Sequence, residues 1–159
     1  MIEIKNPHEV EKTFKNVGDK LGLGIDKDIF RSIVILNSIG YKTSQSCEGH
    51  VDRYTTSPWI DFTWDEKNTK EYFDESLNLL YQNLFQDLKE FYKDRKKIPY
   101  DQNISLVLMD NSMEYLWVRL CQNQNSKCFK GKRTEKLKKY LKEINDFCEF
   151  LNKKYQLKY

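Results

Sequence analysis

Apolar residues change their spacing along this chain in a fixed order, and this order constrains the fold most. Spacings of three and four residues, typical of amphipathic helices, occur in residues 7–21, 26–39, 68–93 and 132–154. Strands are predicted from the shorter segments 41–45, 58–64, 104–109 and 114–121. The strands therefore come in two pairs with a helix between the pairs. This order predicts an α+β fold, in which a small, mostly antiparallel sheet of about four strands packs with about four helices.

Local signals mark the ends of these segments. Asp26 has the position and residue type of a helix N-cap, and Gly40 is placed to end the same helix. Asn68 and Glu71 resemble a capping box at the start of the longest helix. Residues 110–112 (Asp-Asn-Ser) form a turn signal, so the last two strands are predicted to make a hairpin.

The length of 159 residues fits one domain, residues 1–159. The first residues lack the pattern of a signal peptide, and no segment has the apolar length of a membrane span. We therefore expect a cytoplasmic protein with no membrane partner. In a reducing compartment the four cysteines are expected to be free thiols or metal ligands rather than disulfides.

The segment Ser46-Cys47-Glu48-Gly49-His50 gathers a hydroxyl, a thiol, a carboxylate and an imidazole after a predicted strand. Ser46, Cys47 and His50 are the candidate catalytic residues, with His50 as the acid or base because imidazole titrates near neutral pH. Gly49 permits a positive φ, and its backbone N–H and Ser46 could hold an anion. The alternatives are a purely structural turn and a nucleophilic Cys47, against which the neighbouring Glu48 acts.

Residues around this loop are candidates for substrate binding. Thr43 precedes the loop and Arg53 follows it, and the alternative for Arg53 is a solvated polar turn. Asp61 lies between two apolar residues of the next strand, where it either pairs with His50 or faces water.

One further face is a candidate for base stacking. Tyr115, Trp117 and Arg119 share one face of the last predicted strand, and aromatic side chains with an arginine on a sheet can stack bases. The alternative is that this face packs against a helix.

Cys47 and His50 also have the spacing of half a zinc site. Cys121 and Cys128 could supply the other two ligands, although their spacing is wider than is typical and Cys121 is also explained as a core residue. Cys148 lies on the apolar stripe of the last helix, where we expect it in the core. This reading predicts an interaction module held together by zinc.

Basic residues gather at the start of the last predicted helix, over residues 130–142, where Glu135 is the one acid. The net charge of +3 does not by itself indicate a nucleic acid. Cations at a helix N-terminus oppose the helix dipole, so this cluster points to a partner such as a nucleotide or RNA. The alternative is a merely solvated face.

Residues 43–50 (T-S-Q-S-C-E-G-H), followed by 58–62 (P-W-I-D-F), resemble a group of small bacterial and phage proteins without an assigned function. More distantly, residues 25–64 resemble the wybutosine-synthesis methyltransferase family, which modifies a tricyclic tRNA base with S-adenosylmethionine. That family has an acidic helix start, a Leu-Asn pair and a Thr-x-Ser-Ser-Cys-x-Gly-Arg motif. His50 replaces the arginine, and the chain has no G-x-G-x-x-G motif. The resemblance implies a ligand pocket at this loop, with S-adenosylmethionine as the cofactor.

Taken together, these features predict an enzyme or ligand-binding protein that acts on a nucleotide or RNA substrate at residues 43–50. The alternatives are the zinc-held interaction module and a small protein-binding factor, such as a phage-type inhibitor.

Overall fold

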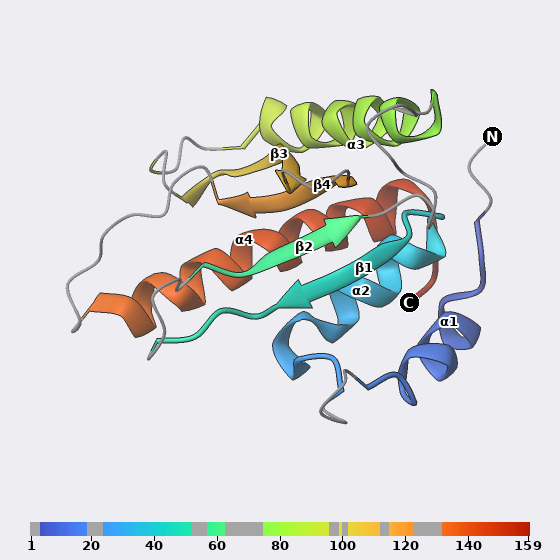
Figure 1. Cartoon of the computed structure of the whole chain (residues 1–159), viewed down its shortest axis with the longest axis horizontal. Coiled ribbons are helices and arrows are strands. Elements are labelled where there is room, and N and C mark those ends of the chain that lie inside the picture. The colour runs from blue at the N-terminus through green and yellow to red at the C-terminus, as the bar shows by residue number, and fades with distance from the viewer. Residues whose placement is uncertain are drawn as a thin grey trace.

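The computed structural model confirms the α+β class. It describes residues 4–18, 24–51, 57–62, 75–95, 99, 102–111, 115–122 and 132–159. Within these residues the elements, in chain order, are α1 (Pro7–Phe14), α2 (Lys27–Ser38), β1 (Thr43–Cys47), β2 (Trp59–Phe62), α3 (Glu75–Lys93), β3 (Ile104–Asn111), β4 (Tyr115–Gln122) and α4 (Arg133–Lys154), as Figure 1 shows.

The four described strands form one antiparallel sheet in the order β1-β2-β4-β3. The predicted hairpin is β3–β4. Asp110 and Asn111 of the predicted turn belong to β3 instead, and Ser112 lies outside the described residues. β2 lies between β1 and β4, and its first residue, Trp59, pairs with Cys47 on one side and with Cys121 on the other. The ends of β1, β2 and β4 are therefore in register where the candidate loop begins.

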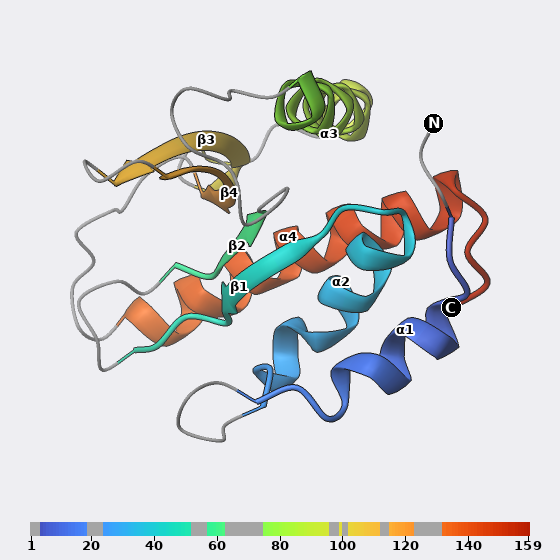
Figure 2. The same ribbon diagram turned by 45° about the vertical axis from the view of Figure 1, so that its right-hand side comes forward.

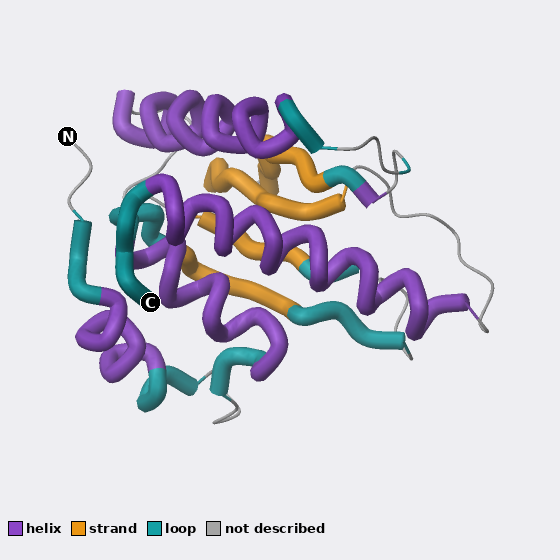
Figure 3. The backbone as a smooth tube through the Cα atoms, turned by 180° about the vertical axis from the view of Figure 1, so that it is seen from behind, coloured by secondary structure: helices purple, strands orange, loops and turns teal. Residues whose placement is uncertain are grey.

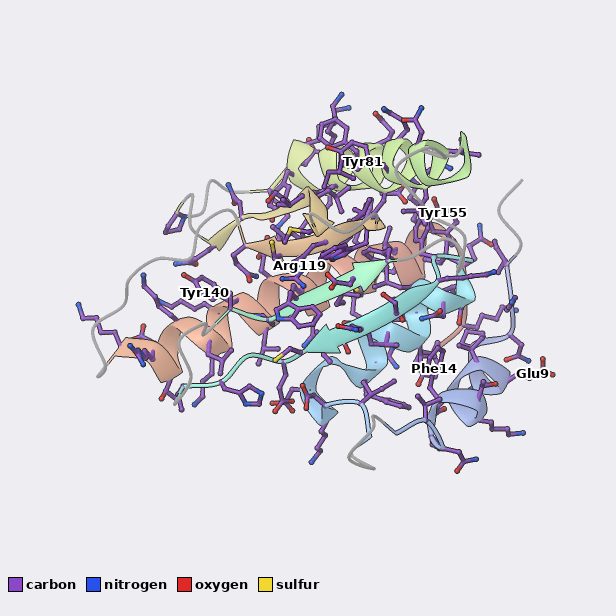
Figure 4. The ribbon with its side chains drawn as sticks, viewed as in Figure 1. Glu9, Phe14, Tyr81, Arg119, Tyr140 and Tyr155 are labelled. Carbon is purple, nitrogen blue, oxygen red and sulfur yellow. The ribbon has the colours of Figure 1, made fainter. Side chains whose placement is uncertain are left out.

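The described helices lie on one face of the sheet, as the views from the side and from behind show (Figures 2 and 3). Ile60, Phe62, Val118 and Leu120 are fully buried on that face, in one core cluster with residues of α2, α3 and α4. Each such side chain contributes about 1.5–3 kcal/mol by leaving water. Residues that alternate with them, including Arg119, lie on the face that no described helix covers (Figure 4).

Two boundaries differ from the predictions near the candidate site. Gly40 has a φ of 91°, and the Tyr41 N–H donates to the Leu36 carbonyl at 3.0 Å, so both residues belong to the end of α2. β1 consequently starts at Thr43, two residues later than predicted, and Cys47 becomes its last residue. α1 ends at Phe14 rather than at residue 21, and Gly18 beyond it pairs with Gly24 in an isolated bridge.

The buried carboxylate of Asp87 connects α3 to the end of α2 and to the end of α4. Asp87 of α3 is 3% exposed and accepts hydrogen bonds from the Tyr41 hydroxyl at 3.1 Å and the Tyr155 hydroxyl at 3.0 Å. The Lys154 ammonium donates to its other oxygen at 2.9 Å. Burial, and then the nearby Asp87 charge, raise the pKa of Tyr41. This network fastens α3 to the end of α2 and to the last turn of α4.

None of the described helices is both long and apolar enough to cross a membrane.

Candidate functional site

Three metal-binding or proton-transferring groups meet where β1 ends. They are the Asp26 carboxylate at the start of α2, the Cys47 thiol at the end of β1 and the His50 imidazole three residues later, and their ligand atoms all lie within 4.8 Å of one another. All three side chains are half-buried, so solvent reaches them. The structure thus brings two of the predicted catalytic residues, Cys47 and His50, to one point and adds Asp26.

The loop is held against α2 by an exchange between two acidic residues. Asp26 occupies the N-cap position as predicted, but among the described residues its side chain makes no capping hydrogen bond to α2. Glu48 performs the cap instead, because its carboxylate accepts the Asp28 N–H at 3.1 Å. In return the Glu48 N–H donates to the Asp26 carboxylate at 3.0 Å. Asp26 is therefore turned away from its helix and toward the loop.

Gly49 has the positive φ that the sequence predicts, at 85°, and is buried. This conformation brings its N–H to 3.3 Å from the Cys47 sulfur, to which it donates a hydrogen bond. Two consecutive backbone N–H groups of the loop, at Glu48 and Gly49, therefore orient Asp26 and Cys47.

The basic start of α4 lies beside this loop. The Arg133 guanidinium donates to the Val51 carbonyl at 3.4 Å, one residue after His50. Lys132 stands at the N-cap position and, within the described chain, provides no side-chain cap to α4. The positive end of the helix dipole and basic side chains therefore meet at this end of the 22-residue helix.

Other predicted binding residues have partners elsewhere. Asp61, 4% exposed, does not pair with His50 but with Arg119, whose Nε and Nη2 donate to its two oxygens at 2.7 and 2.8 Å. This hydrogen bonding raises the pKa of Arg119, which also stacks over Trp59 at 4.1 Å from the ring centre. The two residues form a structural ion pair across β2 and β4.

The remaining predicted residues lie away from the cluster or outside the described chain. Thr43 accepts a hydrogen bond from the Asn37 amide at 2.8 Å, which ties β1 to α2. Ser46 lies within β1 opposite Ile60 and is not one of the three clustered residues. Arg53 falls outside the described residues, as do Cys128 and the first two residues of the basic segment.

The alternative zinc site of four ligands does not combine Cys47 with Cys121. β2 separates Cys121 from Cys47, which places them two strand spacings apart, about 10 Å, too far for one tetrahedral ion. Burial raises the pKa of the Cys121 thiol. Cys148 is fully buried in the core as predicted, and burial raises its pKa to about 12.

A cavity of about 1000 Å³ lies at the opposite end of β1 from the clustered residues. It is lined by parts of α1, the end of α2 and α3, including Val10, Phe14, Tyr41, Lys42 and Leu80. None of the predicted site residues that the structure describes lines it. The predicted pocket and this cavity are therefore different places in the fold.

Sequence reasoning missed Asp26 as part of the site, and it placed Glu48 in the loop without its role as the cap of α2. Asp26 carries a signal, the N-cap pattern, but that pattern predicts a bond to its own helix rather than a contact with a loop more than 20 residues later. Glu48 carries no signal for its capping role, because a carboxylate in a turn is ordinary.

No family model matches this chain, and neither do curated proteins or solved structures.

Proposed function

We propose that the protein binds an RNA or nucleotide at the surface formed by residues 46–50 and the first turns of α4. The observation that carries this proposal is the hydrogen bond from Arg133 to the Val51 carbonyl, because it sets the basic helix start beside the loop that contains His50. The ligand's phosphates would lie at the α4 N-terminus, and its reacting part would face the loop.

The electrostatics of α4 support an anionic ligand. Lys139 pairs with Glu135 and Lys142 pairs with Asp146, which leaves the exposed Lys132 and Lys138 as further cations on the same turns. Cations near a helix N-terminus are each unfavourable by about 0.3–1 kcal/mol, because they face the positive end of the dipole. The negative charge of a bound phosphate offsets this cost.

His50 is the residue that would transfer a proton in a reaction at this site. It is half-buried and lies beside the Asp26 carboxylate, an arrangement in which an acid orients an imidazole. Its position one residue before Val51 places it between the loop and the basic helix start. We therefore expect His50 to be required for ligand function but not for folding.

Reversing two charges at the α4 start should weaken RNA binding without unfolding the protein. We expect Lys132→Glu/Lys138→Glu to lower the affinity for a labelled single-stranded RNA by at least about tenfold and to reduce the slope of log affinity against log salt by about 1.4. Acidic residues near a helix N-terminus are favourable, so lost stability would not explain the loss. Fluorescence anisotropy at several salt concentrations measures both effects.

The matched control is Lys153→Glu/Lys158→Glu, which makes the same charge change at exposed positions at the other end of α4 and beyond it. The same titration with His50→Ala, compared with the exposed His8→Ala, tests the loop itself. Equal effects of the two charge pairs would show that RNA is held only by overall charge, and the proposed surface would be wrong.

The protein-binding alternative has less support. Among the described residues the exposed large apolar side chains are Ile4, Val17, Leu79, Val51, Phe85, Val107 and Leu108. Phe85 is the one aromatic residue in this set, whereas such a factor predicts a large aromatic patch.

A further inference from the structure

We propose that Asp26, Cys47 and His50 bind one Zn²⁺ ion. Carboxylate oxygen, thiolate sulfur and imidazole nitrogen are the three donor types of protein zinc sites. A mixed set of this kind is unsuited to Ca²⁺ and Mg²⁺, which take oxygen ligands. This inference shares Cys47 and His50 with the proposed RNA surface but rests on no residue of α4. A zinc-bound His50 would act as a metal ligand in place of the proton-transferring role proposed above.

The geometry of the cluster is close to that of a tetrahedral site. Zinc bonds of about 2.0–2.3 Å place neighbouring ligand atoms about 3.5 Å apart. The three ligand atoms here lie within 4.8 Å of one another, so any two of them need to approach by no more than about 1.3 Å. Side-chain rotation at half-buried positions supplies a movement of this size without moving the backbone of α2 or β1.

Two of the three proposed ligands already accept hydrogen bonds from backbone N–H groups. Metal-binding side chains are typically oriented by hydrogen bonds from outer groups. The Glu48 N–H donates to Asp26, and the Gly49 N–H donates to Cys47. Glu48 also replaces Asp26 as the cap of α2, so the helix does not depend on the Asp26 side chain that the metal would take. The first two of these bonds orient two of the three proposed ligands, Asp26 and Cys47.

Charge gives a second reason for a cation. A divalent ion among the three side chains would be attracted to the Asp26 carboxylate, which lies within 4.8 Å of the other two ligand atoms. Three protein ligands leave a fourth position, and because all three residues are half-buried, water or a ligand anion reaches it. An open position of this kind is typical of reactive zinc sites rather than of closed structural ones.

The test is a Zn²⁺ titration of the reduced, chelator-treated full chain in competition with a chromophoric chelator. We expect one tight site. Asp26→Asn, Cys47→Ser and His50→Gln should each lower the zinc affinity by at least about 100-fold. A loss of that size exceeds what is typical when a residue that only hydrogen-bonds a metal ligand is removed. The chain offers a matched control for each: Asp28→Asn, Cys121→Ser and His8→Gln.

Circular dichroism confirms that each variant is folded, and the rise in melting temperature with added Zn²⁺ gives a second measure of binding. Tight binding that survives in Cys47→Ser and His50→Gln, or that falls equally in the three controls, would overturn the proposal. Weak binding by the wild type, no tighter than by Cys47→Ser, would overturn it as well. RNA binding is measured without zinc, so either proposal can fail while the other stands.

Discussion

Asp87→Ala is expected to lower the free energy of unfolding by about 4 kcal/mol, because it breaks a buried charged network. Asp87 is 3% exposed and accepts hydrogen bonds from Tyr41, Lys154 and Tyr155. Its removal leaves the buried Tyr41 hydroxyl without this acceptor. The Lys154 ammonium loses its bond to Asp87 and keeps its bond to the Glu90 carboxylate. Urea denaturation followed by circular dichroism measures the loss.

The control for this prediction is Asp94→Ala, at an exposed position just beyond α3, which should change stability by no more than about 0.5 kcal/mol. Tyr41→Phe and Tyr155→Phe each remove one hydrogen bond and should cost about 1 kcal/mol. A loss below about 1 kcal/mol in Asp87→Ala would show that the network contributes little to fastening α3.

Asp61→Ala is expected to destabilise the protein by about 3 kcal/mol, since it leaves Arg119 without its bidentate partner. The loss should be smaller than for Asp87, because the Asp61 carboxylate bonds to one side chain whereas the Asp87 carboxylate bonds to three. Zinc affinity should stay unchanged, because Asp61 is not one of the clustered residues. The same urea experiment, combined with the zinc titration, separates the two effects.

Replacing both members of the pair, as Asp61→Leu/Arg119→Met, should recover much of the stability that the single change loses. A double-mutant cycle then gives the coupling between the two side chains. If Asp61→Ala leaves stability intact but weakens ligand binding, Asp61 belongs to the functional site as the sequence predicts, and its assignment as a structural partner is wrong.

Local sequence signals explain which parts of the fold were predicted. Gly40 follows the end of α2 as predicted, and the limits of α4 lie within one residue of the predicted ones. Both features depend on residues that are neighbours along the chain. The position of β1 was wrong by two residues, because the helix end extends through Tyr41. The strand order was not predicted, because the pairing of β2 with β4 joins segments more than 50 residues apart.

The candidate site was predicted where its residues are neighbours in the sequence and was missed where they are distant. Cys47 and His50 are near neighbours in sequence, and the structure places them together. Asp26 joins them only because Glu48 takes over its capping role, and this exchange depends on how the loop packs against α2. Cys121 was a candidate ligand by residue type alone, and the sheet places β2 between it and the cluster.

The central claim, that Asp26, Cys47 and His50 form a metal centre, is tested most directly by ¹H–¹⁵N spectra of the imidazole rings. The chain has two histidines, so exposed His8 serves as an internal control. One equivalent of Zn²⁺ should shift the ring signals of His50 fully and leave those of His8 in place. Unchanged signals for His50, or equal shifts of both rings, would contradict the account.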